Sequence, residues 1–431
     1  MKDRTFSRYI LPAMTCFVIA IATGAGQAPA PPEAKLDMRS AELKSASAYW
    51  IRVGQSGDPF AFMVVDAEVV GANTLQLGTQ NVLELTLTPA APLVDPGKPL
   101  SVTWNGAPAQ IVSLKQGRVT LRSPEFVDSP MRKNQEISGP ISDLINTPFA
   151  VVIGTTSPDS AMKDMCRRKA ESFVSYWQGW QRMKPRFFKD TELTWQQQSA
   201  YSLLLIGGPD ENLIAKKLGE KLPLRISADQ VVIDGRAFKA TDAAAQVIYP
   251  SPFNPARYVS VVAGTSADGL YFWDPNVSSL GEWDYVIVDG RVTSNSQDLP
   301  SQRMHLASGY FDQRWRMADS FVIPGDADLR TKATLLRAPK INLSIDPKVF
   351  EAYVGRYEVH PGFEVAIVRD GSRLIARGPG QPEIELAPES ETDFIAPAIG
   401  VRIAFVKDSG GKVNAMVIRQ GGREMSAKKI E

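Results

Sequence analysis

Residues 363–376 read Phe363-Glu-Val-Ala-Ile-Val-Arg-Asp370-Gly-Ser-Arg-Leu-Ile-Ala376, and this stretch decides how the end of the chain folds. Apolar side chains occupy every second position from Phe363 to Ile367, and the Asp-Gly-Ser segment at 370–372 is a turn signal that leads into Leu374. Alternation of this kind buries one side chain in two, which is typical of strands that cover a core on one face. The pattern returns at 384–386, 401–405 and 413–417. It predicts a small antiparallel β-barrel over residues 341–431.

The N-terminus has the features of an export signal. Lys2, Arg4 and Arg8 precede an apolar run that ends near Ala25, and small residues surround a cleavage point after Ala28. The run is shorter than the roughly 20 residues that a spanning helix needs, so a cleaved signal peptide over residues 1–28 is favoured over a retained anchor. We therefore expect a periplasmic or extracellular protein with no stable membrane span.

The rest of the chain predicts two further domains, so the fold class is mixed α and β. Closely spaced short strands separated by Gly and Pro over residues 45–123 indicate a β-sandwich or an open barrel. Over residues 139–323, strands alternate with helices, which predicts a central parallel α/β sheet covered on both faces. An aromatic stripe on the helix that ends near Trp180 is predicted to be core, because its members lie three and four residues apart.

One segment resembles the turn that carries the nucleophile in α/β hydrolases. That turn is written G-x-S-x-G, and the nearest match is Gly264-Thr-Ser266-Ala-Asp-Gly269, whose second glycine comes one residue late. Ser266 is therefore a candidate nucleophile, and the simpler interpretation is a helix capped by Ser266 or Thr265.

A serine nucleophile needs a proton acceptor, and the chain has two histidines. His305 is the candidate base, with Asp289 or Asp312 as its acid; a structural histidine is the alternative interpretation. Ser160-Ala-Met-Lys163 matches the S-x-x-K pattern of serine β-lactamases, but the accompanying K-T-G and S-D-N blocks are absent from the sequence.

Composition excludes several other classes of function. A formal net charge of +1 gives no electrostatic basis for nucleic-acid binding. Two histidines and, after cleavage, Cys166 alone do not make a zinc site, so we expect no metal and no cofactor. Cys166 is predicted to be a buried apolar side chain rather than a reactive thiol.

The C-terminal segment resembles the lipocalin-like β domain found behind serine β-lactamase-type hydrolases, on the residues Tyr353-Val-Gly-Arg-Tyr357 and Leu386-Ala-Pro-Glu-Ser-Glu-Thr-Asp-Phe394. The remainder resembles the non-catalytic regions of secreted prolyl-oligopeptidase-like hydrolases, on motifs such as Leu204-Leu-Ile-Gly-Gly-Pro209 and Tyr249-Pro-Ser-Pro-Phe-Asn-Pro255. In those enzymes the catalytic domain precedes this region, and no position here matches its triad. The resemblance implies an exported, non-catalytic accessory or binding protein whose partner is a separately encoded hydrolase or a small or peptide ligand. The alternative is a serine esterase or peptidase with an atypical site at Ser266 and His305.

Overall fold

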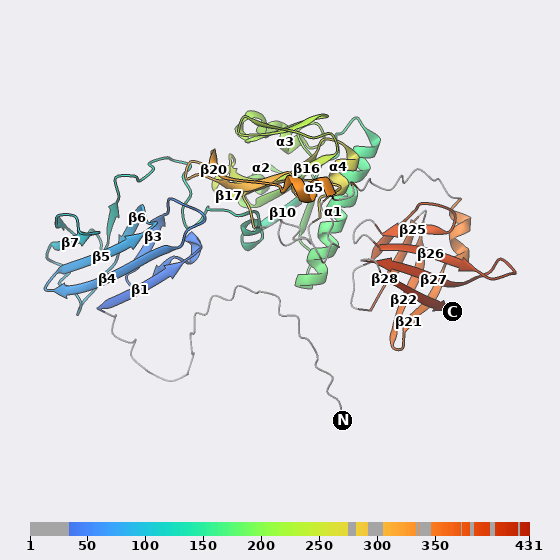
Figure 1. Cartoon of the computed structure of the whole chain (residues 1–431), viewed down its shortest axis with the longest axis horizontal. Coiled ribbons are helices and arrows are strands. Elements are labelled where there is room, and N and C mark those ends of the chain that lie inside the picture. Colours follow the sequence, from blue (N-terminus) through green and yellow to red (C-terminus); the bar gives the residue numbers. More distant parts are fainter. Residues whose placement is uncertain are drawn as a thin grey trace, which may run out of the picture.

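The computed structural model describes residues 34–274, 282–291, 305–332, 335, 346–371, 373–379, 383–396, 401–420 and 423–431. Within them the chain forms an N-terminal β-sandwich, a central α/β domain and a C-terminal barrel, which follow one another along the long axis in Figure 1. The predicted signal peptide, residues 1–28, lies outside the described residues. No helix among the described segments has the length and apolar character needed to cross a bilayer.

The N-terminal domain is a sandwich of two sheets, and not an open barrel. One sheet has the order β1-β4-β5-β7-β8 and the other β2-β3-β6-β9, and apolar residues from both form one core. It begins at Lys35, upstream of the predicted start near residue 45. The strands are β1 Lys35–Ser40, β2 Ser47–Ala48, β3 Ile51–Gln55, β4 Met63–Gly71, β5 Thr74–Gln80, β6 Glu84–Leu87, β7 Leu100–Trp104, β8 Gln110–Val112 and β9 Val119–Arg122.

The central domain is built on an eight-stranded sheet of order β11-β10-β12-β17-β16-β18-β19-β20. Four neighbouring strands, β11, β10, β12 and β17, are parallel, but β16, β18, β19 and β20 pair antiparallel. The prediction of a parallel sheet therefore holds for half of it; a short turn joins β16 to β17 and forces an antiparallel pair. The strands are β10 Phe149–Ile153, β11 Arg186–Lys189, β12 Ser202–Ile206, β16 Ala243–Ser251, β17 Asn254–Gly264, β18 Tyr285–Asp289, β19 Ala307–Phe311 and β20 Met317–Pro324.

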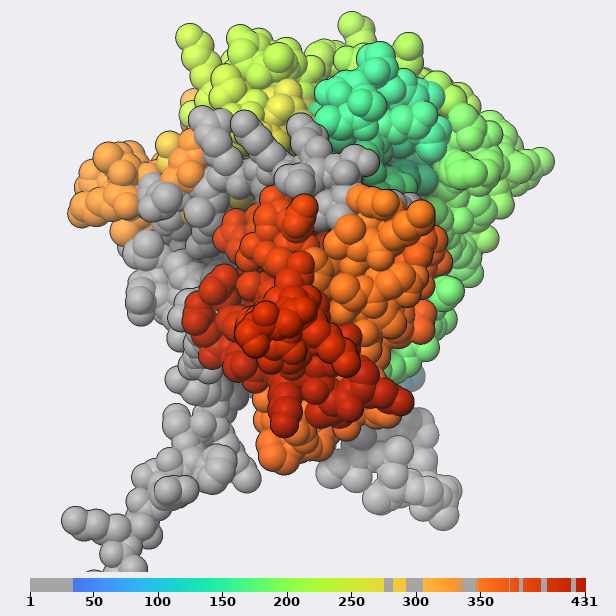
Figure 2. All heavy atoms as spheres, turned by 90° about the vertical axis from the view of Figure 1, so that its right-hand side faces the viewer, coloured from blue at the N-terminus to red at the C-terminus, as the bar shows by residue number. Residues whose placement is uncertain are grey.

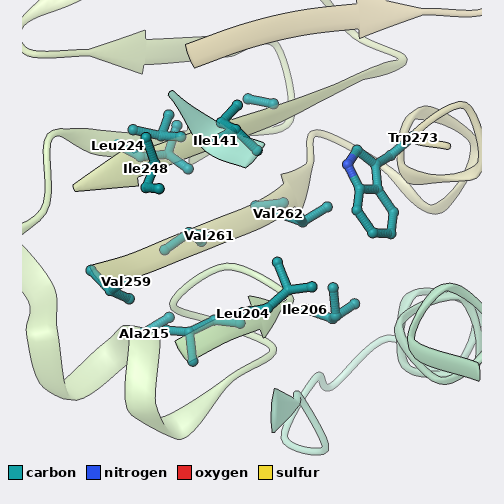
Figure 3. Packing of buried hydrophobic residues seen from close by; sticks show 14 of the residues in the cluster. Ile141, Leu204, Ile206, Ala215, Leu224, Ile248, Val259, Val261, Val262 and Trp273 are labelled. Carbon is teal, nitrogen blue, oxygen red and sulfur yellow. The ribbon is translucent and has the colours of Figure 1, made fainter. Parts of the chain in front are cut away.

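Both faces of the parallel half are covered, as predicted, because every residue of β10 and β12 is buried. Figure 3 shows apolar side chains of β12, β16 and β17 packed together with Ala215 and Trp273. The segment at 231–233 does not join this sheet; it lies in a separate three-stranded sheet, β13 Leu224–Ser227, β14 Gln230–Ile233 and β15 Arg236–Lys239. The helices are α1 Ser160–Gln181, α2 Trp195–Ala200, α3 Leu213–Leu218, α4 Ala267–Tyr271 and α5 Ala327–Lys332, with short 3-10 turns η1 Leu43–Ser45, η2 Ile141–Asn146, η3 Gly219–Lys221 and, before the barrel, η6 Pro347–Ala352.

Helix α1 begins after Asp159, whose carboxylate accepts a hydrogen bond from the Ala161 amide and caps the helix. The aromatic stripe on α1 is only partly core. Phe173 is buried, but Trp180, in the last turn of α1, is 55% exposed. The prediction of a fully buried stripe was wrong at that end.

The C-terminal domain is a closed barrel of eight antiparallel strands, β21 to β28 in sequence order. Its interior is filled by aromatic side chains: Tyr353 stacks on Phe405 with ring centroids 4.4 Å apart, and Phe394 packs edge-on against both. Figure 2 views the molecule from the barrel end, and Arg167 of α1 lies 3.8 Å from Glu385 of the barrel. The strands are β21 Gly355–His360, β22 Phe363–Asp370, β23 Arg373–Arg377, β24 Ile384–Pro388, β25 Asp393–Ala396, β26 Val401–Lys407, β27 Val413–Gln420 and β28 Arg423–Lys429.

Buried charges join the sandwich and its linker to the central domain. Asp143 accepts a hydrogen bond of 2.6 Å from the Tyr258 hydroxyl and forms an ion pair with Lys44 of the sandwich. In the linker between β9 and η2, residues 123–140, Lys133 Nζ donates a hydrogen bond of 2.5 Å to Asp284, and both side chains are buried. Asp143, Lys133 and Asp284 are buried at this junction, whereas Lys44 is exposed.

Candidate active site

The carboxyl ends of the parallel strands are the natural place to look for a site, because ligands of open α/β sheets bind beyond them. Ser266 follows β17 at this edge. Asp289 is the last residue of β18 and pairs with Ala243, the first residue of β16. The next residue of β16, Ala244, pairs with Gly264 at the end of β17. The fold therefore brings Ser266, Asp289 and His305, which precedes β19, to one edge of the sheet.

Ser266 has the geometry of a helix N-cap. Its Oγ accepts a hydrogen bond of 2.9 Å from the Gly269 amide and donates one of 2.9 Å to Asp242. Its φ of −153° and ψ of 168° are ordinary extended values, whereas a nucleophile elbow is a strained turn. The local structure thus matches the simpler interpretation of this segment, a capped helix after a strand.

His305 is buried, with 2% of its surface exposed. Its Nε2 lies 3.1 Å from Ser308 Oγ, and a backbone hydrogen bond joins the ring to Ile323. Burial lowers the pKa of His305 to about 4, and the nearby Arg330 guanidinium acts in the same direction. A general base works best with a pKa near the pH of operation, so an imidazole held in this way is a poor acceptor for a serine proton.

The sheet itself separates the three predicted site residues. β16 and β18 lie between β17 and β19, so Ser266 and His305 are offset by three strand spacings, roughly 14 Å. Asp312 follows the other end of β19, roughly 20 Å from His305 along an extended strand. It accepts hydrogen bonds from the Arg314 and Arg316 amides in a turn. The pairing of Asp312 with His305 was therefore wrong.

Asp289 lies on the correct edge, but its carboxylate is already engaged. Its Oδ2 accepts from Arg291 at 2.9 Å and from Arg330 at 2.5 Å. Two guanidiniums neutralise this carboxylate, which leaves it unsuited to orient a neutral imidazole.

The sequence also singled out Cys166, Ser160 and Lys163. Cys166 is fully buried, and burial together with the nearby Glu211 and Asp190 raises the pKa of its thiol to about 12. Ser160 and Lys163 are exposed on the first turn of α1. Within the described segments, no three His, Cys, Asp or Glu side chains gather as a metal site would require.

Two pockets were missed by sequence reasoning. One, of about 450 Å³, lies between α1 and the barrel and is lined by residues such as Arg168, Phe187 and Ile384. The other, of about 400 Å³, lies on the sandwich and is lined by residues that include Arg52 and Arg118. The first pocket is lined by residues of two domains that are far apart in the chain, so no local sequence pattern indicates it. The second had a weak one, since Arg52 alternates with the buried Ile51 and Val53.

Comparison with known proteins gives a partial relationship. No family model matches the chain. It is 29% identical over 87 residues to a penicillin-binding protein of Bacillus subtilis (strain 168). The match covers 20% of this chain and spans only about a fifth, 19%, of that protein's length. Over this short region the chain is similar to a protein whose name records penicillin binding.

Proposed function

We propose that this chain is an exported, non-catalytic binding or accessory protein that acts beside a serine hydrolase. The short similarity to a penicillin-binding protein supports a link to that class of enzyme. The closed eight-stranded barrel supports it further, because the resemblance of residues 341–431 to the β domain that accompanies such hydrolases implies a small barrel here. Its partner is a separately encoded hydrolase, or a small or peptide ligand.

The proposal depends on the hydrogen-bond partners of Ser266 and on the burial of His305. The serine oxygen caps α4 and bonds to Asp242, and the imidazole is buried against Ser308 with a pKa of about 4. Nucleophilic catalysis requires these groups to share a proton, and each is committed to a different neighbour. Binding needs no such arrangement.

The test is an ester and peptide hydrolysis assay on the mature chain, with acyl groups of several lengths and with a fluorophosphonate probe that labels active serines. We expect no turnover and no labelling for the wild type, for Ser266→Ala, or for the exposed-serine control Ser227→Ala. Turnover or labelling that is lost in Ser266→Ala and kept in Ser227→Ala would establish the alternative, a serine esterase or peptidase that uses Asp242 or a rearranged His305.

The accessory role has its own test in the native host. An affinity-tagged copy is expected to be recovered from the exported fraction with its N-terminus near Pro29, together with a hydrolase. Recovery from the cytoplasm with residues 1–28 retained would contradict the export part of the proposal. If no hydrolase is recovered and the protein binds a small ligand, the binding role is supported and the accessory role is contradicted.

A further inference from the structure

The pocket on the sandwich is built on the outer face of the sheet β2-β3-β6-β9. Arg52 on β3 lies opposite Thr86 on β6, and Thr86 lies opposite Thr120 on β9, so three polar side chains form a row across the strands. Their neighbours along each strand, such as Val53 and Leu85, point into the core. The alternation of a two-sided sheet thus places guanidinium and hydroxyl groups together on one face.

The linker that follows β9 closes this face into a pocket, and two glutamines fix its position. Gln55 bonds in both directions to the backbone of Val127, at 3.0 and 2.9 Å. Gln135 is buried, donates to the carbonyl of Val53 at 2.8 Å and accepts a hydrogen bond from Arg52 Nε. The walls are therefore set by buried hydrogen bonds and do not depend on exposed side chains alone.

The charges that line the pocket leave a positive surplus. The pocket is lined by three arginines, Arg52, Arg118 and Arg132, and by two glutamates, Glu84 and Glu136. The net charge of its lining is therefore three minus two, or +1. Glu84 forms ion pairs with Arg132 and with Arg122, which lies outside the lining. Arg132 also lies 3.9 Å from Asp128, a second residue outside the lining, so these two added charges cancel and the net charge stays +1.

The arginines differ in how far their hydrogen-bonding groups are used. Phe126 packs beneath the guanidinium of Arg132 at 5.1 Å and holds it in place. The Nε of Arg132 is buried without a partner. Among the described residues, Arg52 and Arg118 have no carboxylate within ion-pair distance.

We propose that this pocket binds the oxyanion of a small ligand, a carboxylate or a phosphate. Guanidinium groups recognise both through paired N–H donors. The hydroxyls of Thr86 and Thr120 share a hydrogen bond of 3.0 Å, so one of their two protons remains as a further donor. A volume of about 400 Å³ accommodates more than the anion alone, such as the last residues of a peptide. The inference rests on the proposed binding role for its biological meaning, but the chemistry of the pocket does not depend on the absence of catalysis.

Calorimetric titration of the mature chain at low ionic strength tests this with three probes: inorganic phosphate, N-acetyl-trialanine with a free carboxylate, and the same peptide with a C-terminal amide. We expect the amide to bind at least tenfold more weakly than the carboxylate. Arg118→Gln is the principal variant, because among the described residues the Arg118 side chain forms no hydrogen bond and no ion pair. It is expected to lower the affinity for the anion about tenfold. Arg225→Gln, an exposed arginine on β13, is the matched control and is expected to change nothing.

The two anion probes separate the sources of the oxyanion: tighter binding of phosphate indicates a phosphorylated ligand, and tighter binding of the peptide indicates a peptide terminus. Equal binding of the acid and the amide, an equal loss in Arg118→Gln and Arg225→Gln, or no binding of either anion at about 10 mM would overturn the proposal. Arg52→Lys keeps the charge but loses the planar fork, so an affinity between the wild type and Arg118→Gln is expected. None of these results depends on hydrolase activity, so failure here is distinguishable from failure of the proposed function.

Discussion

Replacement of Lys133 by Met removes one partner of the buried ion pair at the junction between the linker and the central domain. Asp284 is fully buried; its Oδ2 accepts from Lys133 Nζ at 2.5 Å and from the Phe311 amide at 2.9 Å. Its Oδ1 has no hydrogen-bond partner. The ammonium also lies 4.9 Å from the ring of Trp315. The variant therefore leaves a buried carboxylate with one remaining donor.

Loss of one partner of a buried pair costs about 3–5 kcal/mol, because the remaining charge is neither solvated nor compensated. Replacement of both partners removes the charge as well, so Lys133→Met combined with Asp284→Asn is expected to cost less than the single change. Burial already holds the pKa of Asp284 above its ordinary value in the presence of Lys133, and loss of the lysine raises it further. Protonation of Asp284 removes the uncompensated charge, so the cost of Lys133→Met is expected to be smaller at pH 5 than at pH 8.

Urea unfolding is the assay, with hydrogen exchange of the segments 283–291 and 305–317 as the readout for the central domain. With a slope of about 3 kcal/mol per molar urea, the single variant is expected to shift the midpoint by about 1–1.7 M. A shift below about 0.3 M would refute the reasoning, as would a double variant less stable than the single one or a cost that grows as the pH falls. Any of these outcomes would mean that the carboxylate is not held as an uncompensated charge.

Three further predictions concern single residues. The pKa of His305 is lowered to about 4 from 6.5, so the unfolded chain binds more protons than the folded chain below pH 6.5. The free energy of unfolding is therefore expected to fall by up to about 3 kcal/mol as the pH drops through this range. His305→Gln should remove most of this pH dependence in unfolding measured between pH 7 and pH 4. Gly139→Ala places a Cβ 1.9 Å from an oxygen of Asp284 at a φ of +75°. It should lower the melting temperature far more than Gly235→Ala, where φ is +85° and no atom lies within 4 Å of the new Cβ. Equal losses in melting temperature would contradict the steric argument. Cys166 should react with maleimide only after denaturation, because its thiol is buried with a pKa of about 12, and rapid labelling of the native chain would show that the core around it opens.

Local sequence patterns were sufficient for much of the fold. The alternation at Phe363–Ile367 lies within β22, and the apolar run at 149–153 is β10 with every residue buried. Signals of this kind are short-range, so they survive without knowledge of what the segment packs against. The direction of a strand has no such signal, which is why the antiparallel half of the central sheet was not predicted.

The candidate site shows the same limit. Sequence spacing placed Ser266 after a strand and before a helix, which the structure confirms. It could not give the distance from Ser266 to His305, because this depends on the two strands, β16 and β18, that lie between theirs. Nor could it bring Asp289 to the same edge as Ser266, since that follows from the order of strands across the sheet.

By itself, then, the amino-acid sequence determined the mixed α and β class, the position of many of the strands and of α1, and the burial of Cys166, since periodicity and capping act within a few residues. Only the tertiary structure decided which side chains meet. It separated Ser266 from His305 and buried Lys133 against Asp284. It also gathered Arg52 of β3, Thr86 of β6 and Arg118, which precedes β9, around one pocket. The physical reason is that sheet order and register join residues that are far apart in the chain, and no local preference records those pairings.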